Sequence, residues 1–390
     1  MEQLIKTLRQ LPTDIDPQGE EPAAIVSLSD AELVQAVARA IANPKSSEGT
    51  SFTLHAPLEL LARATLLQLT PPQARSVGRI RIASIAAQYS KGDEVDLPER
   101  TFPTLRQAKS ALIAALREGD AETADAAVVA LASGISAQEF CSLLSDGIAA
   151  NLGAAAHAPL LLEALPGAAA RYGNLSILLR APIRALATGP GAKLTWIDEP
   201  AVLSGPEDLW KALAEPPHIA SPSYAIAPTM LAVESDGFAS RLLGRATQSA
   251  PEALSRSLLR IAALSMIQDD PNQAPYGWTH CLTLPQGVMA LAPYAEDVDR
   301  LVRIAATFVL GFRSTLGKDR LDESWKPTRS PDVSTLAARA AACADAHLAK
   351  YTVACLAAAA ADPAERQLFL AAANYLGEWW DAHPEATFDG

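Results

Sequence analysis

Twenty-eight prolines interrupt a chain of 390 residues whose remaining sequence is typical of helices. Alanine-rich stretches such as 337–342 and 357–361 favour helices, because alanine has the highest intrinsic helix propensity. The aromatic residues that strands favour make up only 5% of the chain. Proline ends or kinks a helix, so this number of prolines predicts many short helices joined by stiff corners. We therefore expect an all-α protein, built as a compact multi-helix bundle with proline-rich connections.

Amphipathic periodicity locates these helices along most of the chain. Ser29 and Asp30 supply an N-cap signal for the first of them. In the segment 72–88, the spacing of Arg75 and Arg79, with Arg81 to one side, indicates a solvated helix face. The expected helices cover residues 31–42, 58–69, 72–88, 105–117, 121–132, 137–152, 158–169, 174–187, 209–214, 251–267, 297–312, 333–361 and 363–382.

The domain organisation follows from length and from the proline-rich segments. Prolines and acidic residues crowd positions 12–22, so residues 1–28 are expected to form a mobile leader. Residues 29–390 are expected to form a single all-α domain, within the size range of one large domain. Segments rich in proline and glycine at 189–206 and 215–228 divide it into two sub-blocks, 29–188 and 229–390.

Charge and cysteine usage exclude several classes of protein. Forty-four acidic residues against thirty-two basic ones give a net charge of −12, which argues against binding to nucleic acid or to an anionic membrane. The chain has no signal-peptide start and no apolar run of the length a membrane span requires. The four cysteines lie far apart, which favours free buried thiols. We therefore expect a soluble cytoplasmic protein.

The six histidines fall into two groups. His55, His157, His280 and His347 lie in apolar, helical surroundings, whereas His218 lies in a proline-rich loop and His383 near the C-terminal end. The sequence His-Ala-Pro-Leu occurs twice, at 55–58 and 157–160, and in each copy the histidine is expected to open an apolar helix.

A single buried histidine is ordinarily a hydrogen-bonded structural residue, but four of them favour a different interpretation. Burying several imidazoles is unfavourable unless each finds a partner, and a shared metal ion satisfies all of them together. Helix bundles hold metals with side chains projected inward from several helices. The sequence therefore predicts a metal site formed by His55, His157, His280 and His347.

Lys350 extends this prediction. It lies three residues after His347, so both side chains share one face of the helix expected over 333–361. The rest of that helix is small or apolar, so one interpretation is a buried Lys350, with a lowered pKa and the capacity to act as a nucleophile, a base or a CO₂ acceptor. The alternative is a lysine that extends along its stem to solvent.

Motifs for the common rival chemistries are missing from the sequence. It contains no G-x-G-x-x-G, H-E-x-x-H, C-x-x-C or G-x-S-x-G pattern, and the segment 188–193 lacks the spacing of a phosphate-binding loop. Trp379 and Trp380 with Tyr375 have the helical spacing of core residues, although they are also suited to line a pocket for a planar substrate.

The chain resembles the questin oxidase-like family, a helical group of oxygenases that act on polyketide anthraquinones. Residues 345–352 (DAHLAKYT), 361–363 (ADP) and 368–373 (LFLAAA) carry the specific part of the likeness. Residues 277–280 (GWTH) and the surroundings of His55 and His157 extend it, in order, over about residues 50 to 378. Fungal members carry several histidines around the first motif, whereas this chain has His55 alone and is shorter, which puts its substrate in doubt.

The resemblance implies an enzyme that oxidises or cleaves a ring of an aromatic polyketide or quinone-like substrate with dioxygen. Some members are described as Baeyer–Villiger enzymes that use NADPH, for which this chain shows no motif, and others as metal-dependent dioxygenases. In the latter, one non-heme Fe(II) is held by four histidines and a carbamylated lysine. Those positions match His55, His157, His280, His347 and Lys350, and His347 and Lys350 are also the expected catalytic residues. Glu59 and Asp345 are suited to orient the imidazoles.

Two alternatives remain open at the level of sequence. The first is a non-catalytic all-α protein that binds a ligand or a partner and whose histidines are structural. The second is a zinc or nickel hydrolase built around a carbamylated lysine. The metal content separates both from the oxygenase.

Overall fold

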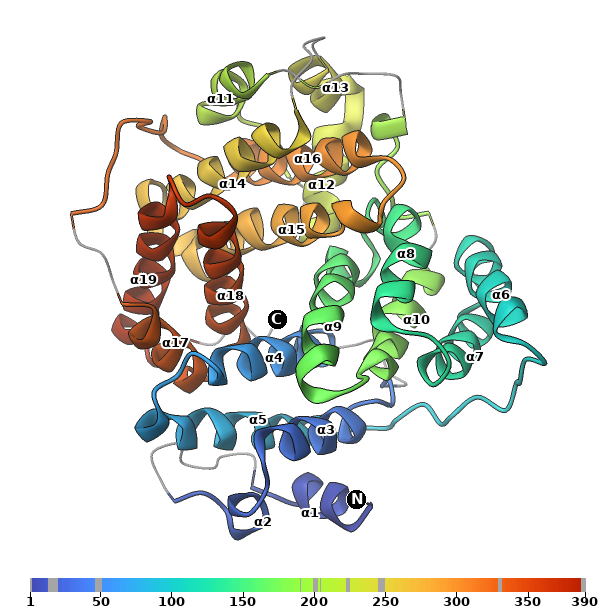
Figure 1. Cartoon of the computed structure of the whole chain (residues 1–390). Coiled ribbons are helices and arrows are strands. Elements are labelled where there is room, and N and C mark those ends of the chain that lie inside the picture. Colours follow the sequence, from blue (N-terminus) through green and yellow to red (C-terminus); the bar gives the residue numbers. More distant parts are fainter. Residues whose placement is uncertain are drawn as a thin grey trace.

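The computed structural model describes residues 2–12, 20–45, 51–189, 191–198, 203, 205–221, 225–244, 250–328 and 332–386, without the side chains of 51–54 and 236. Within these ranges the regular structure is helical, with nineteen α-helices, short 3₁₀ and π turns, and two isolated β-bridges but no strand (Figure 1). The expectation of an all-α, multi-helix protein is confirmed. No helix in the described ranges has the length and apolar character needed to cross a bilayer.

The helices are short, as the prolines predict. In chain order they are α1 (Glu2–Arg9), α2 (Ala23–Val26), α3 (Asp30–Ala40), α4 (Ser51–Leu67), α5 (Arg75–Tyr89), α6 (Leu105–Glu118), α7 (Ala121–Ala132), α8 (Ala137–Ile148), α9 (Ala158–Tyr172), α10 (Arg180–Thr188), α11 (Pro206–Ala214), α12 (Ile226–Glu234), α13 (Phe238–Leu243), α14 (Pro251–Gln268), α15 (Thr279–Ala290), α16 (Val298–Leu316), α17 (Val333–Ala342), α18 (Ala346–Ala361) and α19 (Arg366–Ala382).

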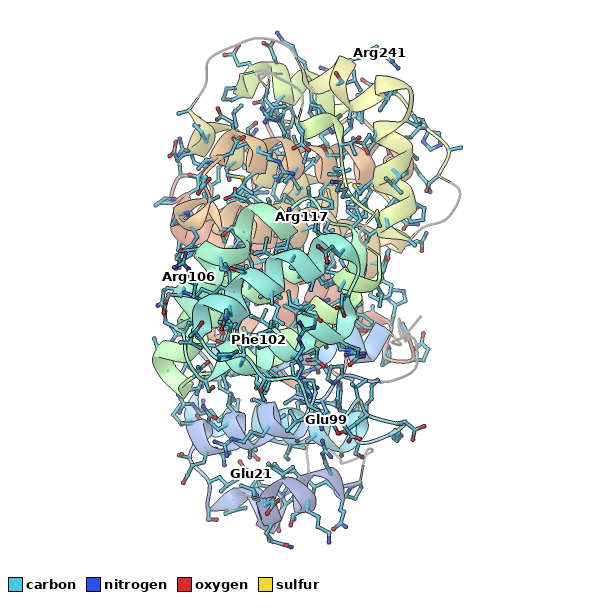
Figure 2. The ribbon with its side chains drawn as sticks, turned by 90° about the vertical axis from the view of Figure 1, so that its right-hand side faces the viewer. Glu21, Glu99, Phe102, Arg106, Arg117 and Arg241 are labelled. Carbon is cyan, nitrogen blue, oxygen red and sulfur yellow. The ribbon has the colours of Figure 1, made fainter. Side chains whose placement is uncertain are left out.

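The helices stack in layers from the N-terminal end to the opposite end of the molecule (Figure 1). Helices α1 and α2 lie at one end, followed by α3 and α5. Helices α4, α9, α15 and α18 then frame the centre, with α14 and α16 beyond them and α11 and α13 at the far end. The pair α6 and α7 packs together on one face, where Arg106 and Arg117 of α6 are seen in Figure 2. The central frame is the part of the fold that positions the candidate site.

Local sequence signals explain many of the helix starts. Ser29 caps α3 in a reciprocal capping box with Glu32, as its sequence predicts, and Ser136 does the same for α8 with Glu139. Helix α4 differs from the prediction, because it begins at Ser51 rather than near Leu58. His55 therefore lies inside α4 and not at its start. Helix α15, which follows the π turn Ala274–Trp278 and contains Pro285, was not predicted as a helix.

Two surface predictions near the N-terminus are wrong for the described residues. The leader expected over residues 1–28 contains α1 and α2, whose Leu8 and Ile25 side chains are fully buried; residues 13–19 lie outside the described ranges. The expected solvated face of α5 is also incorrect. Arg79 is buried and forms ion pairs with Glu21 and Asp30, because these acids fold back onto α5 from the preceding segment.

The two sub-blocks expected at 29–188 and 229–390 pack directly on each other. Helices α4 and α9 of the first contact α18 and α15 of the second, respectively. The interface between the sub-blocks is thus the central frame itself. All four cysteines are free thiols, as expected; Cys141, Cys281 and Cys355 are buried and Cys343 is half-buried.

The long helix expected over 333–361 is broken, and this prediction is wrong. Helix α17 ends at Ala342 and α18 begins at Ala346, with Asp345 as its N-cap. The fully buried Arg63 of α4 stabilises the break, because its guanidinium donates hydrogen bonds to the carbonyl oxygens of Ala341 and Cys343, both at 2.8 Å. His347 consequently lies in the first turn of α18 rather than in the middle of a helix.

Candidate metal centre

Each helix of the central frame brings one histidine to the same place. His55 lies in the second turn of α4, His157 is the N-cap of α9, and His280 and His347 are the second residues of α15 and α18. All four side chains are buried, with at most 5% of any residue exposed. The sequence prediction that these four histidines meet is therefore correct in space, although they lie up to 292 positions apart along the chain, from 55 to 347.

The four rings form a tight cluster. The Nε2 atoms of His55 and His157 lie 3.1 Å apart. One nitrogen each of His55, His157 and His280 lies within 4.8 Å of the others. The centroid of the His347 ring is 4.8 Å from that of His55 and 5.2 Å from that of His280. The nitrogens of His55, His157 and His280 are thus close enough to bind one ion, and the ring of His347 lies beside them.

Hydrogen bonds fix the direction in which three of the rings present their nitrogens. The Nδ1 atoms of His157 and His280 contact the carbonyl oxygens of Ala155 (2.7 Å) and Tyr276 (2.8 Å). A carbonyl only accepts, so both Nδ1 atoms donate and each Nε2 atom carries the lone pair; that of His157 faces the Nε2 atom of His55 at 3.1 Å. The Nε2 atom of His280 is buried and has no hydrogen-bond partner among the described residues. A metal ion fits this donor set, because it would satisfy that nitrogen.

Asp345 orients the fourth ring. Its carboxylate accepts a hydrogen bond from Nδ1 of His347 at 2.8 Å and another from the backbone N–H of His347 at 2.6 Å. Burial alone would raise the pKa of Asp345, but these hydrogen bonds and the attraction of nearby positive charge lower it below its usual value. The arrangement is the carboxylate–histidine pair that commonly supports metal ligands. The expectation that Asp345 contacts a candidate ligand is confirmed.

Burial keeps the imidazoles neutral. It lowers the pKa values of His55, His157 and His280 well below the usual value, and the positive charge of Lys350 lowers each of them further. These histidines are therefore uncharged near pH 7, which is the form that binds metal ions.

Lys350 is buried beneath the cluster, as one of the two sequence interpretations predicts. Only 6% of the residue is exposed, so the alternative of a lysine that reaches solvent is wrong. Burial lowers the pKa of Lys350 to about 7, although Asp345 and Glu59 oppose the shift. The Nζ atom has no hydrogen-bond partner among the described residues. A substantial fraction of Lys350 is therefore a neutral amine at pH 7.

Glu59, the other expected orienting acid, has Arg63 as its hydrogen-bonding partner. Arg63 Nε donates to Glu59 Oε1 at 2.6 Å, and both side chains are buried. Burial raises the pKa of Glu59, and the charge of Arg63 opposes this shift. Glu59 therefore acts on the site through Arg63, which holds the loop that leads to Asp345.

A left-handed turn positions His157. Ala154, Ala155 and Ala156 have φ angles of 52°, 48° and 57°, a conformation that strains residues other than glycine. The turn places the carbonyl of Ala155 at the Nδ1 edge of the His157 ring, where it accepts the hydrogen bond. No glycine occupies these three positions, so the sequence does not predict this feature.

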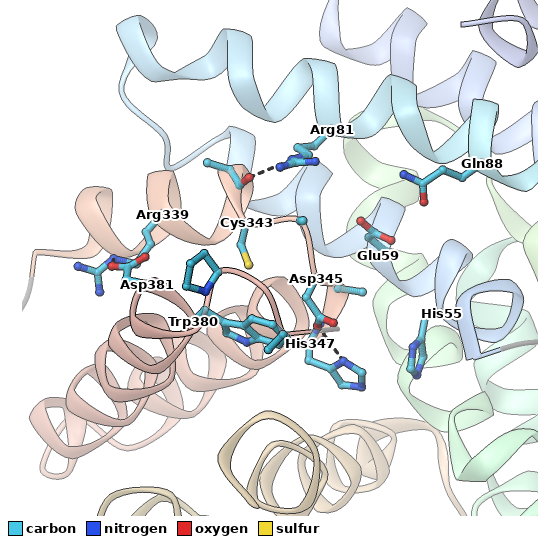
Figure 3. A pocket seen from close by; sticks show the side chains of 15 residues that line it. His55, Glu59, Arg81, Gln88, Arg339, Cys343, Asp345, His347, Trp380 and Asp381 are labelled. Atoms are coloured by element: carbon cyan, nitrogen blue, oxygen red, sulfur yellow. Dashed lines mark hydrogen bonds and ion pairs between the residues drawn. The ribbon is translucent and has the colours of Figure 1, made fainter. Parts of the chain in front are cut away.

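A cavity of about 600 Å³ opens onto the cluster (Figure 3). His55 and His347 lie at its inner end, and Trp380 and Asp381 line another part of its wall. Its polar wall residues Arg81, Gln88 and Arg339 belong to no recognisable motif, and the spacing of Arg81 in the sequence indicated only a solvated helix face. The full lining is His55, Glu59, Arg81, Gln88, Arg339, Ala342, Cys343, Ala344, Asp345, Ala346, His347, Trp380, Asp381, Pro384 and Ala386.

The other two histidines lie outside the cluster. His218 is exposed, and His383 is exposed and stacks on Trp379 with ring centroids 4.3 Å apart. Trp380 is 7% exposed, so it is both a core residue and a cavity residue.

Comparison with known proteins adds no assignment: no protein-family model, curated protein or solved structure matches this chain.

Proposed function

We propose that this protein is a metal-dependent oxygenase that uses non-heme Fe(II) to oxidise or cleave a ring of an aromatic, quinone-like substrate. The observation that carries the proposal is the convergence of four buried histidines from four helices, with an unpaired nitrogen on His280. Imidazole suits iron, copper, nickel and zinc, and an added anionic oxygen donor favours iron among the redox-active metals. Bound iron would supply the one-electron chemistry that dioxygen requires.

Lys350 is the proposed source of that oxygen donor. The lone pair of its neutral Nζ would form a C–N bond to CO₂, one C=O electron pair would move to oxygen, and the proton would leave the nitrogen for solvent. The product is a carbamate with a negative charge beside the imidazoles. The lowered pKa of Lys350 and its burial next to the cluster support this step.

The four histidines and Asp345 have distinct roles in the proposal. His55, His157, His280 and His347 present neutral nitrogens to the ion, and their burial excludes bulk water. Asp345 holds the proton on Nδ1 of His347, which keeps the lone pair on Nε2 and increases the basicity of that ligand.

The large cavity suits the organic substrate. Its volume of about 600 Å³ lies within the usual range for small-molecule sites, roughly 300–1,000 Å³. Trp380 offers an aromatic surface for a planar ring, and Arg81 and Gln88 offer N–H donors for hydroxyl or carbonyl oxygens (Figure 3). His55 and His347 line the same cavity, so a metal that they hold would lie beside one end of such a molecule.

The test is reconstitution of the full chain with Fe(II) under anaerobic conditions, followed by ¹⁸O₂ and a panel of hydroxylated naphthoquinones and anthraquinones in oxidised and reduced forms. We expect dioxygen uptake and ¹⁸O in the product, both lost in His347→Ala and retained in His383→Ala. A requirement for NADPH would select the Baeyer–Villiger form of the reaction.

Two results would refute the oxygenase. Stoichiometric zinc or nickel with hydrolysis of ester or amide substrates would identify the hydrolase instead. A folded protein that binds no metal would leave the non-catalytic binding protein.

A further inference from the structure

A second, much smaller cavity of about 50 Å³ lies within the central frame. None of the described residues lines both this cavity and the large one. We call it the axial cavity. Its lining residues are Leu58, Leu61, Ala62, Thr65, Leu160, Glu163, Ala164, Thr283, Gln286, Lys350, Val353 and Ala354, and thus come from α4, α9, α15 and α18.

The inner ring of the axial cavity is in register with the histidine cluster. Leu58, Leu160, Thr283 and Lys350 each follow one of the four histidines by three positions, as 55 and 58, 157 and 160, 280 and 283, and 347 and 350 show. Residues three apart share a helix face, so these side chains form the next layer after the imidazoles. The axial cavity therefore begins one helical turn from the cluster.

The inner ring is buried, whereas the outer wall is more open. Leu58, Leu160 and Lys350 are each 6% exposed and Thr283 is 2% exposed. The outer residues Thr65, Glu163, Gln286 and Val353 are half-buried. The cavity thus leads from the molecular surface toward the cluster along the inside of the four helices that frame the centre in Figure 1.

Size and polarity limit what the axial cavity holds. An apolar cavity of about 150 Å³ binds benzene, so a space of about 50 Å³ excludes an aromatic substrate and admits a molecule of two or three heavy atoms. The hydroxyl groups of Thr283 and Thr65 already donate to the backbone carbonyls of Thr279 and Leu61. On the inner ring, only the Nζ atom of Lys350 is left without a partner among the described residues. The polar groups of Glu163 and Gln286 lie on the half-buried outer wall. A buried water needs two to four polar partners, so an apolar gas is the better occupant of the inner part of the cavity.

We propose that the axial cavity binds a small apolar gas and is the route by which dioxygen reaches the histidine cluster, separate from the path of the organic substrate. The second part rests on the proposed oxygenase function. Separate paths allow dioxygen to reach the metal while the organic substrate fills the large cavity.

Dioxygen is paramagnetic, so its position is measurable in the metal-free full-length protein. Methyl spectra recorded under dioxygen and under nitrogen pressure should show stronger relaxation at the methyl groups of Leu58 and Leu160, each 6% exposed, than at those of Ile135, which is 7% exposed and lies outside the cavity. Val353→Phe fills the axial cavity and should abolish the effect at Leu58 and Leu160. Ala357→Phe, at an exposed position one turn further along the same helix and outside the cavity lining, should preserve it.

Ala164→Leu provides a second way to fill the cavity, from α9, if Val353→Phe does not fold. In the iron-loaded enzyme, either filled variant should raise the KM for dioxygen several-fold and leave the KM for the organic substrate and the kcat at saturating dioxygen unchanged. Ala357→Phe should leave all three constants unchanged.

The outcomes separate this proposal from the oxygenase itself. Relaxation equal at Ile135 and Leu58, or an unchanged KM for dioxygen in a filled variant of an active oxygenase, would refute the route alone. Selective relaxation at the axial cavity in a protein that consumes no dioxygen would refute the oxygenase and, with it, the use of the cavity as a dioxygen route.

Discussion

Replacing Arg63 tests the account of how the site is positioned. The side chain is fully buried, pairs with Glu59 at 2.6 Å, and donates to the carbonyls of Ala341 (2.8 Å), Cys343 (2.8 Å) and Ala344 (3.1 Å). Arg63→Met keeps the length of the side chain but removes every one of these bonds. It leaves the carboxylate of Glu59 buried without its partner and releases the break between α17 and α18.

The expected loss of stability is large. Removal of one partner from a buried ion pair costs about 3–5 kcal/mol. Cys343 is half-buried and Ala344 is exposed, so water replaces part of the hydrogen bonding that their carbonyls lose. The broken ion pair therefore accounts for most of the lost stability. Arg63→Lys keeps the charge but not the planar fork, so its loss should be smaller. In a double-mutant cycle with Glu59→Gln, the double variant should lose less stability than the sum of the two single losses, by about 1–3 kcal/mol.

The loss should also depend on pH. Burial raises the pKa of Glu59 above its unfolded value, and without Arg63 the pKa rises further. A carboxyl with a raised pKa binds its proton more tightly when folded, so it destabilises the protein as pH rises above the unfolded pKa. Urea unfolding of the metal-free Arg63→Met variant should therefore show a greater deficit at pH 8 than at pH 5. A deficit below about 1 kcal/mol, the value of an exposed ion pair, would refute the reasoning. So would a deficit of equal size at both pH values.

Three further predictions concern the cluster. Asp345→Ala should lower the free energy of unfolding by about 1 kcal/mol, because the N-cap of α18 is lost, and should weaken metal binding about 10- to 100-fold. Asp345→Asn should keep the cap, so equal unfolding midpoints for the two variants would contradict this prediction. Lys350→Met should stabilise the metal-free protein, and the fall in the pKa of Lys350 limits the gain to about 5 kcal/mol. In denaturant titrations the gain should grow as pH falls from 10.5 toward 7 and then level off. A gain independent of pH would be inconsistent with a buried amine. Ala155→Gly should raise stability by up to about 1 kcal/mol, because it relieves a left-handed φ at some cost in chain entropy, and Ala155→Val should lower it; thermal unfolding of both variants checks the sign.

Features that depend on composition and short-range pattern were predictable from the sequence. Alanine content and proline spacing predicted the helical class, and Ser29 marked the start of α3. Counting histidines in apolar helical segments predicted the cluster, because a buried imidazole must find a partner wherever the helices carry it. The apolar surroundings of Lys350 left a buried amine and a lysine that reaches solvent both open, and only the packing around α18 decides between them.

Features that depend on partners distant in the chain were not predictable. The break at residues 343–345 contains neither proline nor glycine, and Arg63 from α4 stabilises it. The sequence spacing of Arg79 is that of a surface residue, and only the ion pair with Glu21, which folds back onto α5, explains its burial. Alanine disfavours the left-handed conformation, so the turn before His157 has no local signal. The two cavities arise from packing between helices that no motif connects.

The metal content of the full chain tests the central claim most directly. Protein purified without oxygen and reconstituted with Fe(II) is analysed for bound metal beside His280→Ala and His383→Ala, with circular dichroism to verify that each variant is folded. We predict stoichiometric iron in the wild type and in His383→Ala, and its loss in His280→Ala. A folded wild-type protein without iron, or a His280→Ala variant that retains it in full, would contradict the account.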